Sequence, residues 1–470
     1  MTQQEAPPHP VETMLDEARF TRTHRKVWLL SAMGVLLDGF DFFIMGVALP
    51  LIVQEWSLGS VEKGLVGSSA VVGAVVGASC LGALTDRIGR QRAFRLDLGM
   101  FVVFSLLSAL APGLWWLIVF RFLLGVGIGA DYPIGSSYVA EIAPRRIRGR
   151  LIVSAFSAQA IGQLLGVVVG LIILNVYPEF DAWRWMLGFG VIPAVIVVYL
   201  RRGVPESPRW LVHMGRYDEA AHVLSEFTER TVDRAELAGH VAGDADEQIA
   251  PLPPPWRQLF RRPLRRKTAL TAAPWFLMDI ATYGIGVFTP TIIAAIIVSD
   301  TSQGTTHYLA DDITATEGAA FVDIFLIVGF ALAIWLIATV GKINLQTIGF
   351  IVMAAALLLL ANTTGPDGGD DSSIVVVFIG FALFNVFMNM GPNSTTYLMP
   401  AEVYPTLSRA SGAGLAAAAG KTGAALGTLL FPILEDDIGL NWTLALIATG
   451  CLFAAAITYA LRAEARSASS

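Results

Sequence analysis

The chain has 470 residues, of which 54% are hydrophobic and only 15% are charged, and its formal net charge is −6. Soluble domains carry about 25% charged residues, so this composition excludes an ordinary soluble enzyme. The charges are concentrated in particular loops instead of spread over one face, so they point to no nucleic-acid partner. Cys80 and Cys451 both lie in apolar segments, which leaves neither a disulfide framework nor a thiolate metal site.

Apolar stretches of about 20 residues, long enough to cross a bilayer, recur along the chain. They begin near residues 26, 62, 92, 116, 148, 183, 268, 317, 345, 373, 406 and 441. A polar segment with an amphipathic stretch at 217–228 divides them six and six. We therefore expect an all-α membrane protein of 12 transmembrane helices: tail 1–24, N-terminal half 25–201, cytoplasmic linker with amphipathic helices 202–265, C-terminal half 266–463 and tail 464–470.

Orientation follows from the basic residues, which are retained on the cytoplasmic side of a membrane. Basic residues gather in segments 22–26, 87–95, 145–150, 261–267 and 462–466, whereas acidic residues gather in 300–317, 367–371 and 435–437. The two sets fall on alternate sides of the predicted spans. The pattern predicts that both termini and the linker are cytoplasmic.

A short pattern occurs once in each predicted half. Glutamate, proline and arginine recur with the same spacing, as Glu141, Pro144 and Arg148 and again as Glu402, Pro405 and Arg409. Two homologous six-helix halves explain this recurrence. Parallel repeats of this kind place a substrate site between the halves near the bilayer midplane, and they work by rocking of one half against the other.

The loop after the second span carries a motif made of Gly82, Asp86, Arg87, Gly89 and Arg90. It resembles the loop signature of the major facilitator superfamily, and this resemblance implies the major facilitator fold and a cytoplasmic gate held by Asp86. The second half keeps Gly341 and Lys342 of the corresponding loop but lacks the aspartate. The segment 205–211 resembles the sugar-porter branch, which identifies the branch but not the substrate.

Ionisable groups inside the spans mark function, because a charge in the bilayer core costs a few kcal/mol or more. Trp275, Asp279 and Tyr283 follow one another at i, i+4 and i+8, and so share one helix face. Asp38 and Asp41 lie three residues apart in the first span. The remaining polar groups of this kind are Arg121 and Asp131 in the fourth span, Asn393 in the tenth and Lys421 in the eleventh.

Two further segments, Gly129-Ala-Asp131-Tyr132-Pro133 and Gly391-Pro392-Asn393, resemble motifs of the phosphate:proton symporter family. The resemblance implies proton-coupled import of inorganic phosphate by alternating access. Its phosphate ligands correspond to Tyr132, Gln159, Trp275, Asp279, Tyr283 and Asn393, with Lys421 beside them, and its proton-coupling residues to Asp38, Asp41 and Asp131, with Arg121 below. Ala130 replaces a glycine of the family pattern, and Gly39-Phe40 also departs from it.

Such a site suits dihydrogen phosphate. Hydroxyl, amide and indole groups donate to its oxygens, lysine supplies positive charge, and the Asp279 carboxylate accepts the P–OH hydrogens, which sulfate lacks. Importing one negative charge costs about 2.3 kcal/mol per 100 mV, so net drive by the voltage requires more than one proton per anion. Two roles stay open: Arg121 could brace a carboxylate structurally, and Lys421 could pair permanently with Asp279.

Two other functions stay open. Asp38-Gly-Phe-Asp41 is also the first-span pattern of aromatic-acid:proton symporters, and a non-transporting nutrient receptor could share the fold. We expect no enzymatic activity, no cofactor and no metal. The expected partners are inorganic phosphate, protons and membrane lipid, with no nucleic acid, in a monomeric multi-pass protein of the cell membrane.

Overall fold

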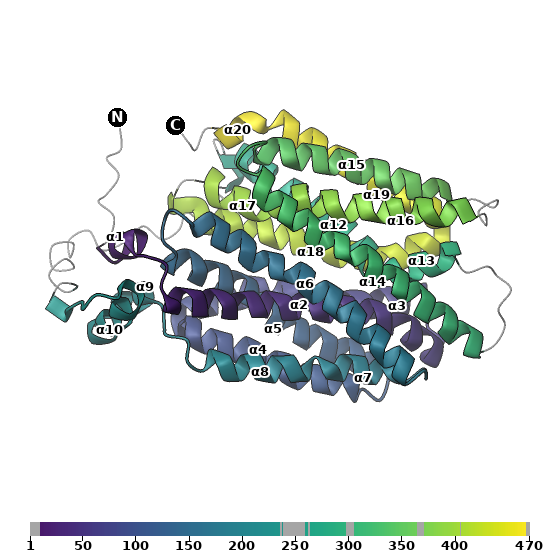
Figure 1. Ribbon diagram of the computed structural model, residues 1–470, viewed down its shortest axis with the longest axis horizontal. Helices are drawn as coiled ribbons and strands as arrows, with labels where there is room; N and C mark the ends of the chain where they lie inside the picture. The colour runs from purple at the N-terminus through teal and green to yellow at the C-terminus, as the bar shows by residue number, and fades with distance from the viewer. Residues whose placement is uncertain are drawn as a thin grey trace.

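The computed structural model describes residues 10–235, 237, 259–261, 264–297, 305–363, 371–404 and 406–466. Within these ranges the chain is almost entirely helical. Ten helical segments are long and apolar enough to cross a membrane. Two more, α4 and α12, carry several charges at one end and run alongside them (Figure 1). The expected all-helical membrane fold is confirmed, with ten to twelve crossing segments in the described residues.

The first half contains α2 (Arg22–Trp56), α3 (Ser60–Ile88), α4 (Arg90–Ala109), α5 (Leu114–Ile142), α6 (Arg148–Val176), α7 (Ala182–Phe189) and α8 (Val191–Arg201). The second half contains α12 (Leu264–Gly286), α13 (Thr289–Ile297), α14 (Thr305–Leu336), α15 (Lys342–Thr363), α16 (Asp371–Met388), η2 (Asn389–Asn393), α17 (Ser394–Val403), α18 (Thr406–Ile438) and α19 (Leu440–Ala460). Three crossing segments are interrupted: α7 with α8, α12 with α13, and α16 with η2 and α17.

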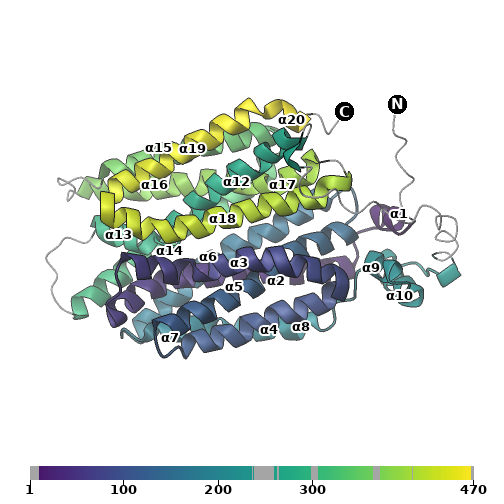
Figure 2. The same ribbon diagram turned by 180° about the vertical axis from the view of Figure 1, so that it is seen from behind.

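The two halves lie side by side, and both views show the helices of each half grouped together (Figures 1 and 2). Four short helices gather at one end of the bundle, which we call the linker end: α1 (Pro10–Glu17), α9 (Pro208–His213), α10 (Tyr217–Thr228) and α20 (Arg462–Arg466). The first and last described helices therefore share one end of the molecule.

Glycines allow neighbouring helices to approach closely. A Cβ on Gly125 or Gly129 of α5 would collide with the backbone of Ala70 or Ala74 on α3. Dispersion contacts between such close backbones are a main source of helix association in a membrane. Gly125 and Gly129 of the fourth span are therefore packing sites.

The halves are packed together at the end opposite the linker. Lys63 of α3 lies 3.7 Å from Glu435 of α18, and a Cβ on Gly64 would collide with the Leu429 carbonyl. Gly46 of α2 makes an equally close approach to the Val287 carbonyl between α12 and α13. This end of the interface between the halves is closed.

The helix α14 begins earlier than its sequence pattern indicated. Its apolar window was predicted to start near residue 317, with Asp312 in a polar loop, but the helix starts at Thr305 and buries Asp312, which is 6% exposed. The prediction was wrong because acidic residues lower the average hydropathy of a window whichever way they face. On a helix, one face is buried while another faces solvent or lipid.

Candidate functional site

The hydroxyl of Tyr283 joins three helices from the two halves. It accepts a hydrogen bond from Gln159 Nε2 of α6 at 3.1 Å and another from Lys421 Nζ of α18 at 2.9 Å. A tyrosine hydroxyl has two acceptor lone pairs and one hydrogen, so the Tyr283 hydrogen is still available for a ligand. Gln159 belongs to the first half and the other two residues to the second, so the cluster bridges the two halves.

Asp279 and Trp275 lie on the same face of α12 as Tyr283, as the spacing predicted. Asp279 interacts electrostatically with the Lys421 ammonium, and the Trp275 indole approaches the Asp279 carboxylate. A side chain at Gly420 would collide with the Trp275 ring. The glycine therefore makes room for the indole directly beside the lysine, and the cluster combines a cation, a carboxylate and neutral donors.

Aromatic rings surround this cluster. The Phe42 ring meets the Tyr283 ring edge-on, with centroids 5.5 Å apart, and Lys421 Nζ lies 5.7 Å from the Phe42 centroid. One turn closer to the linker end, Phe156 of α6 stacks on Tyr397 of α17 at 4.3 Å. Tyr397 also meets Trp275 at 4.7 Å. These rings contact one another across the two halves and close the cluster on that side.

Sequence reasoning missed these aromatic residues. The available signals were weak: Phe42 directly follows Asp41, and Tyr397 lies one helical turn after Asn393. The described members of the predicted site are between 2% and 6% exposed, so the cluster is shut off from solvent in this conformation. Those members are Gln159, Trp275, Asp279, Tyr283, Asn393 and Lys421.

The two first-span carboxylates have different surroundings. Asp41 Oδ1 forms an ion pair with Arg121 Nη1 of α5 at 2.7 Å, and both side chains are buried. Asp38 interacts electrostatically with Lys421, and its Oδ2 atom has no hydrogen-bond partner among the described residues. Asp41 Oδ2 also has no hydrogen-bond partner there, so the difference is in charge: Arg121 balances Asp41, while no described residue forms an ion pair with Asp38.

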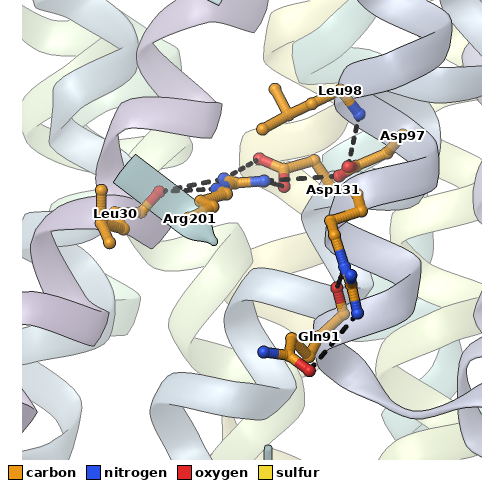
Figure 3. A network of polar contacts seen from close by, with 7 residues as sticks. Leu30, Gln91, Asp97, Leu98, Asp131 and Arg201 are labelled. Atoms are coloured by element: carbon orange, nitrogen blue, oxygen red, sulfur yellow. Dashed lines mark hydrogen bonds and ion pairs between the residues drawn. The ribbon is translucent and has the colours of Figure 1, made fainter. Parts of the chain in front are cut away.

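Asp131 lies in a second buried network, shown in Figure 3. Arg201, the last residue of α8, donates to Asp131 Oδ1 at 2.9 Å and to the Leu30 carbonyl at 3.1 and 2.9 Å. It also lies 3.5 Å from Asp97 Oδ2, and its guanidinium stacks over Phe94 at 4.2 Å. One guanidinium thus faces two carboxylates. The sequence did not indicate Arg201 or Asp97, because Arg201 stands at the polar boundary of its span beside Arg202.

Asn393 is engaged within its own half. Its amide donates to Asn389 Oδ1 at 2.6 Å, and Asn389 donates to the Leu326 carbonyl of α14 at 3.1 Å. Both residues lie in the π-helical turn η2, which contains Pro392. A proline removes one backbone donor, and side-chain amides supply hydrogen bonds around this turn. The role of Asn393 as a phosphate donor stays a prediction.

The loop motif is described in part. Gly89 has φ +90°, in the region that favours glycine. Arg90 pairs with Glu141 at 2.9 Å, and its backbone N–H donates to Glu206 at 2.8 Å. Glu206 belongs to the segment that resembled the sugar-porter branch, so both motifs meet at one contact. The side chains of Asp86, Arg87 and Tyr132 lie outside the described residues, as do the surroundings of Gly82.

The second half repeats this contact. Gly341 has φ +82°, and the following residue, Lys342, pairs with Glu402, which is the repeat counterpart of Glu141. Glycine, cation and glutamate thus occupy corresponding places in both halves. The loop that has lost its aspartate still keeps the helix-start contact of the motif.

The comparisons with known proteins agree with this architecture. A family model described as Sugar (and other) transporter matches residues 27–467. The probable inorganic phosphate transporter 1-10 of Oryza sativa subsp. japonica is 30% identical, and the alignment covers 97% of this chain and 90% of that protein. The inner membrane metabolite transport protein YgcS of Escherichia coli is also 30% identical, with 95% and 92% covered.

Two further comparisons extend this result. The repressible high-affinity phosphate permease of Neurospora crassa is 27% identical, with 88% of this chain and 78% of that protein covered. The partially occluded inward open structure of the xylose transporter XylE from E. coli superposes with a TM-score of 0.73 over 93% of this chain and 99% of that one, at 19% identity, a likeness that concerns the fold. The chain belongs to the sugar (and other) transporter family of the major facilitator superfamily, a family of membrane transporters and not of enzymes.

Proposed function

We propose that the protein imports inorganic phosphate together with protons, by alternating access between its two halves. The observation that carries this proposal is the closed cluster around Tyr283, where Gln159 and Lys421 converge from opposite halves beside Asp279. A bound anion would replace the hydrogen bonds that these groups now make with one another. Because the donors come from both halves, binding favours a state in which the halves are together.

The composition of the cluster fits dihydrogen phosphate. Lys421 offers one positive charge, and the Tyr283 hydroxyl, the Gln159 amide and the Trp275 indole offer neutral donors. Tyr132 and Asn393 complete the proposed ligand set. The Asp279 carboxylate accepts hydrogen bonds from P–OH groups and repels fully ionised sulfate, so the same residue binds one anion and rejects the other.

Asp38 is the proposed proton carrier beside the substrate. Asp41 and Asp131 each form an ion pair with a guanidinium, that of Arg121 and that of Arg201, whereas Asp38 forms none with any described residue. Protonation of Asp38 removes a buried negative charge close to the anion site, so a proton and phosphate favour each other's binding. In this proposal the protonation of Asp38 changes the electrostatic field at Arg121 and Arg201. Through these arginines it affects their ion pairs with Asp41 and Asp131.

Orientation and boundaries form part of the proposal. The protein lies in the cell membrane, with its linker end on the cytoplasmic side. Its segments are the tail 1–24, the N-terminal half 25–201, the linker 202–265, the C-terminal half 266–463 and the tail 464–470. A second candidate function, import of aromatic or other organic acids with protons, is favoured by the rings of Phe42, Phe156 and Tyr397 around the cluster.

Uptake of labelled phosphate into proteoliposomes under an imposed pH gradient tests the function. Phosphate should accumulate in sodium-free buffer, and a protonophore should abolish the accumulation. Arsenate should compete, whereas sulfate and 4-hydroxybenzoate should not. Competition by 4-hydroxybenzoate without phosphate uptake would select the second candidate, and accumulation driven by sodium at clamped pH would contradict proton coupling. Phosphate binding without any transport would indicate a receptor.

A further inference from the structure

The helix α14 carries a line of buried polar groups that the proposed site does not use. Asp312, Thr316 and Asp323 are spaced four and seven residues apart, so they lie on one helix face. They are 6%, 0% and 2% exposed, and Asp312 and Asp323 are about 16 Å apart along the axis, at 1.5 Å per residue. The opposite face, with Glu317, Phe321 and Ile324, is exposed.

Two of these polar groups have a buried oxygen that is unsatisfied. Asp312 Oδ2 and Thr316 Oγ1 are buried without a hydrogen-bond partner in the described part of the chain. No described residue forms an ion pair with Asp312 or Asp323. An ionised carboxylate buried in an apolar environment without a partner is strongly disfavoured, and such a group takes up a proton instead.

The packing of α14 indicates where this line of polar groups, the acidic stripe, points. Gly318 and Gly329 mark the face of α14 that packs on α13, α16 and η2, because a Cβ on either would meet Ile293, Phe378 or Asn389. That face lies about a third of a turn from the acidic stripe at 100° per residue. The other helix packed extensively on α14 is α6 of the first half. We infer that the stripe points toward α6.

The described side chains on the elements around the stripe provide no positive charge near it. Charged or titratable residues on these elements are Arg148 and Arg150 at the linker end of α6, Asp371 at the start of α16, and His307, Tyr308, Asp311 and Glu317 on α14 itself, while α13 and η2 have none. A metal ion would need several more oxygen ligands, and the described residues contain no group of three side chains suited to a metal. The ligand that fits is a proton.

We propose that Asp312 and Asp323 are proton-binding sites of the C-terminal half, and that their protonation permits the two halves to pack together at the end opposite the linker. When the carboxylates lose their protons, their charges face the apolar side of α6, and separation of the halves lets water reach them. In the proposed orientation this end faces outward. The sites then load from the outside, and their protonation accompanies closure of the outer end.

The test uses Asp312→Asn, Asp323→Asn and the double variant, because asparagine imitates the neutral carboxyl in size. Glu317→Gln is the matched control, an exposed acid on the same helix. The first readout is the melting temperature of the detergent-solubilised protein between about pH 5 and pH 8. The wild-type melting temperature should fall as pH rises, because the buried carboxylates of the closed state lose their protons and become unpaired charges in an apolar environment. The double variant should lose more of this slope than either single variant, and Glu317→Gln should lose none, while Asp38 keeps its own share of the slope.

The second readout is phosphate transport, and it rests on the proposed function. Exchange of phosphate across a membrane without a pH gradient should stay within about twofold of wild type in the variants, because the stripe lies outside the substrate cluster. The rise of uptake at low external pH should shrink severalfold in the double variant. Failure of wild type to transport phosphate would remove the proposed function but leave the melting test decisive. Asparagine variants with wild-type melting and uptake profiles would overturn the proton sites.

Discussion

Replacement of Arg201 by methionine tests the buried network of the first half. The guanidinium is 1% exposed, and it makes two hydrogen bonds to the Leu30 carbonyl as well as the ion pair with Asp131 at 2.9 Å. Methionine keeps much of the length and apolar volume of the side chain. The substitution therefore removes the charge and the donors without opening a large cavity, and it leaves Asp97 and Asp131 facing each other without a cation.

The expected loss of stability is about 3–5 kcal/mol, the usual cost of removing one partner of a buried ion pair. Loss of the stacking on Phe94 adds roughly 0.5–2 kcal/mol at most. For a half of this size the sum corresponds to a fall in melting temperature on the order of 10 °C. The fall should be smaller in acid buffer, because protonation neutralises the carboxylates that the substitution strands.

The assay is thermal unfolding of the detergent-solubilised protein, followed by tryptophan fluorescence, at neutral and acid pH. Arg202→Met is the control, since Arg202 is the exposed neighbour of Arg201. Asp131→Asn placed in the Arg201→Met background should restore part of the lost stability, and a double-mutant cycle measures this coupling. Equal melting temperatures for wild type and Arg201→Met, or additive effects in the cycle, would refute the reasoning.

Three further predictions concern the substrate cluster and the packing around it. Asp279→Asn should leave the protein folded but reduce phosphate transport and relax the rejection of sulfate, because an amide accepts fewer hydrogen bonds than a carboxylate and does not repel an anion. Unchanged uptake and selectivity would exclude Asp279 from the site. Lys421→Met should lower phosphate affinity severalfold, with melting temperature near wild type; lost stability with intact affinity would instead show a structural pair. Gly34→Ala should destabilise the folded protein by about 1–3 kcal/mol, because the added methyl group would collide with Asp131 and Arg201. The control Gly99→Ala, whose methyl group meets open space, should be neutral or stabilising in the same melting assay.

The sequence alone determined the architecture, because its signals are local. A run of about 20 apolar residues crosses a bilayer wherever it occurs, so the crossing segments could be counted before any packing was known. The spacing of Trp275, Asp279 and Tyr283 placed them on one helix face for the same reason. The repeat of Glu141 as Glu402 indicated two halves, and the two glutamates do occupy matching ion pairs with Arg90 and Lys342.

The tertiary structure decided which of these faces meet. Asp131 pairs with Arg201, which is 70 residues away, and no local pattern indicates that choice of partner. The contacts of Phe156 with Tyr397 and of Asn393 with Asn389 likewise depend on which helices lie together and on how η2 turns. Asp312 shows the limit of a hydropathy average most clearly: the average counts its charge, but only the packing of α14 on its neighbours determines that the carboxylate is buried, because burial depends on the direction of a side chain and on what lies opposite it.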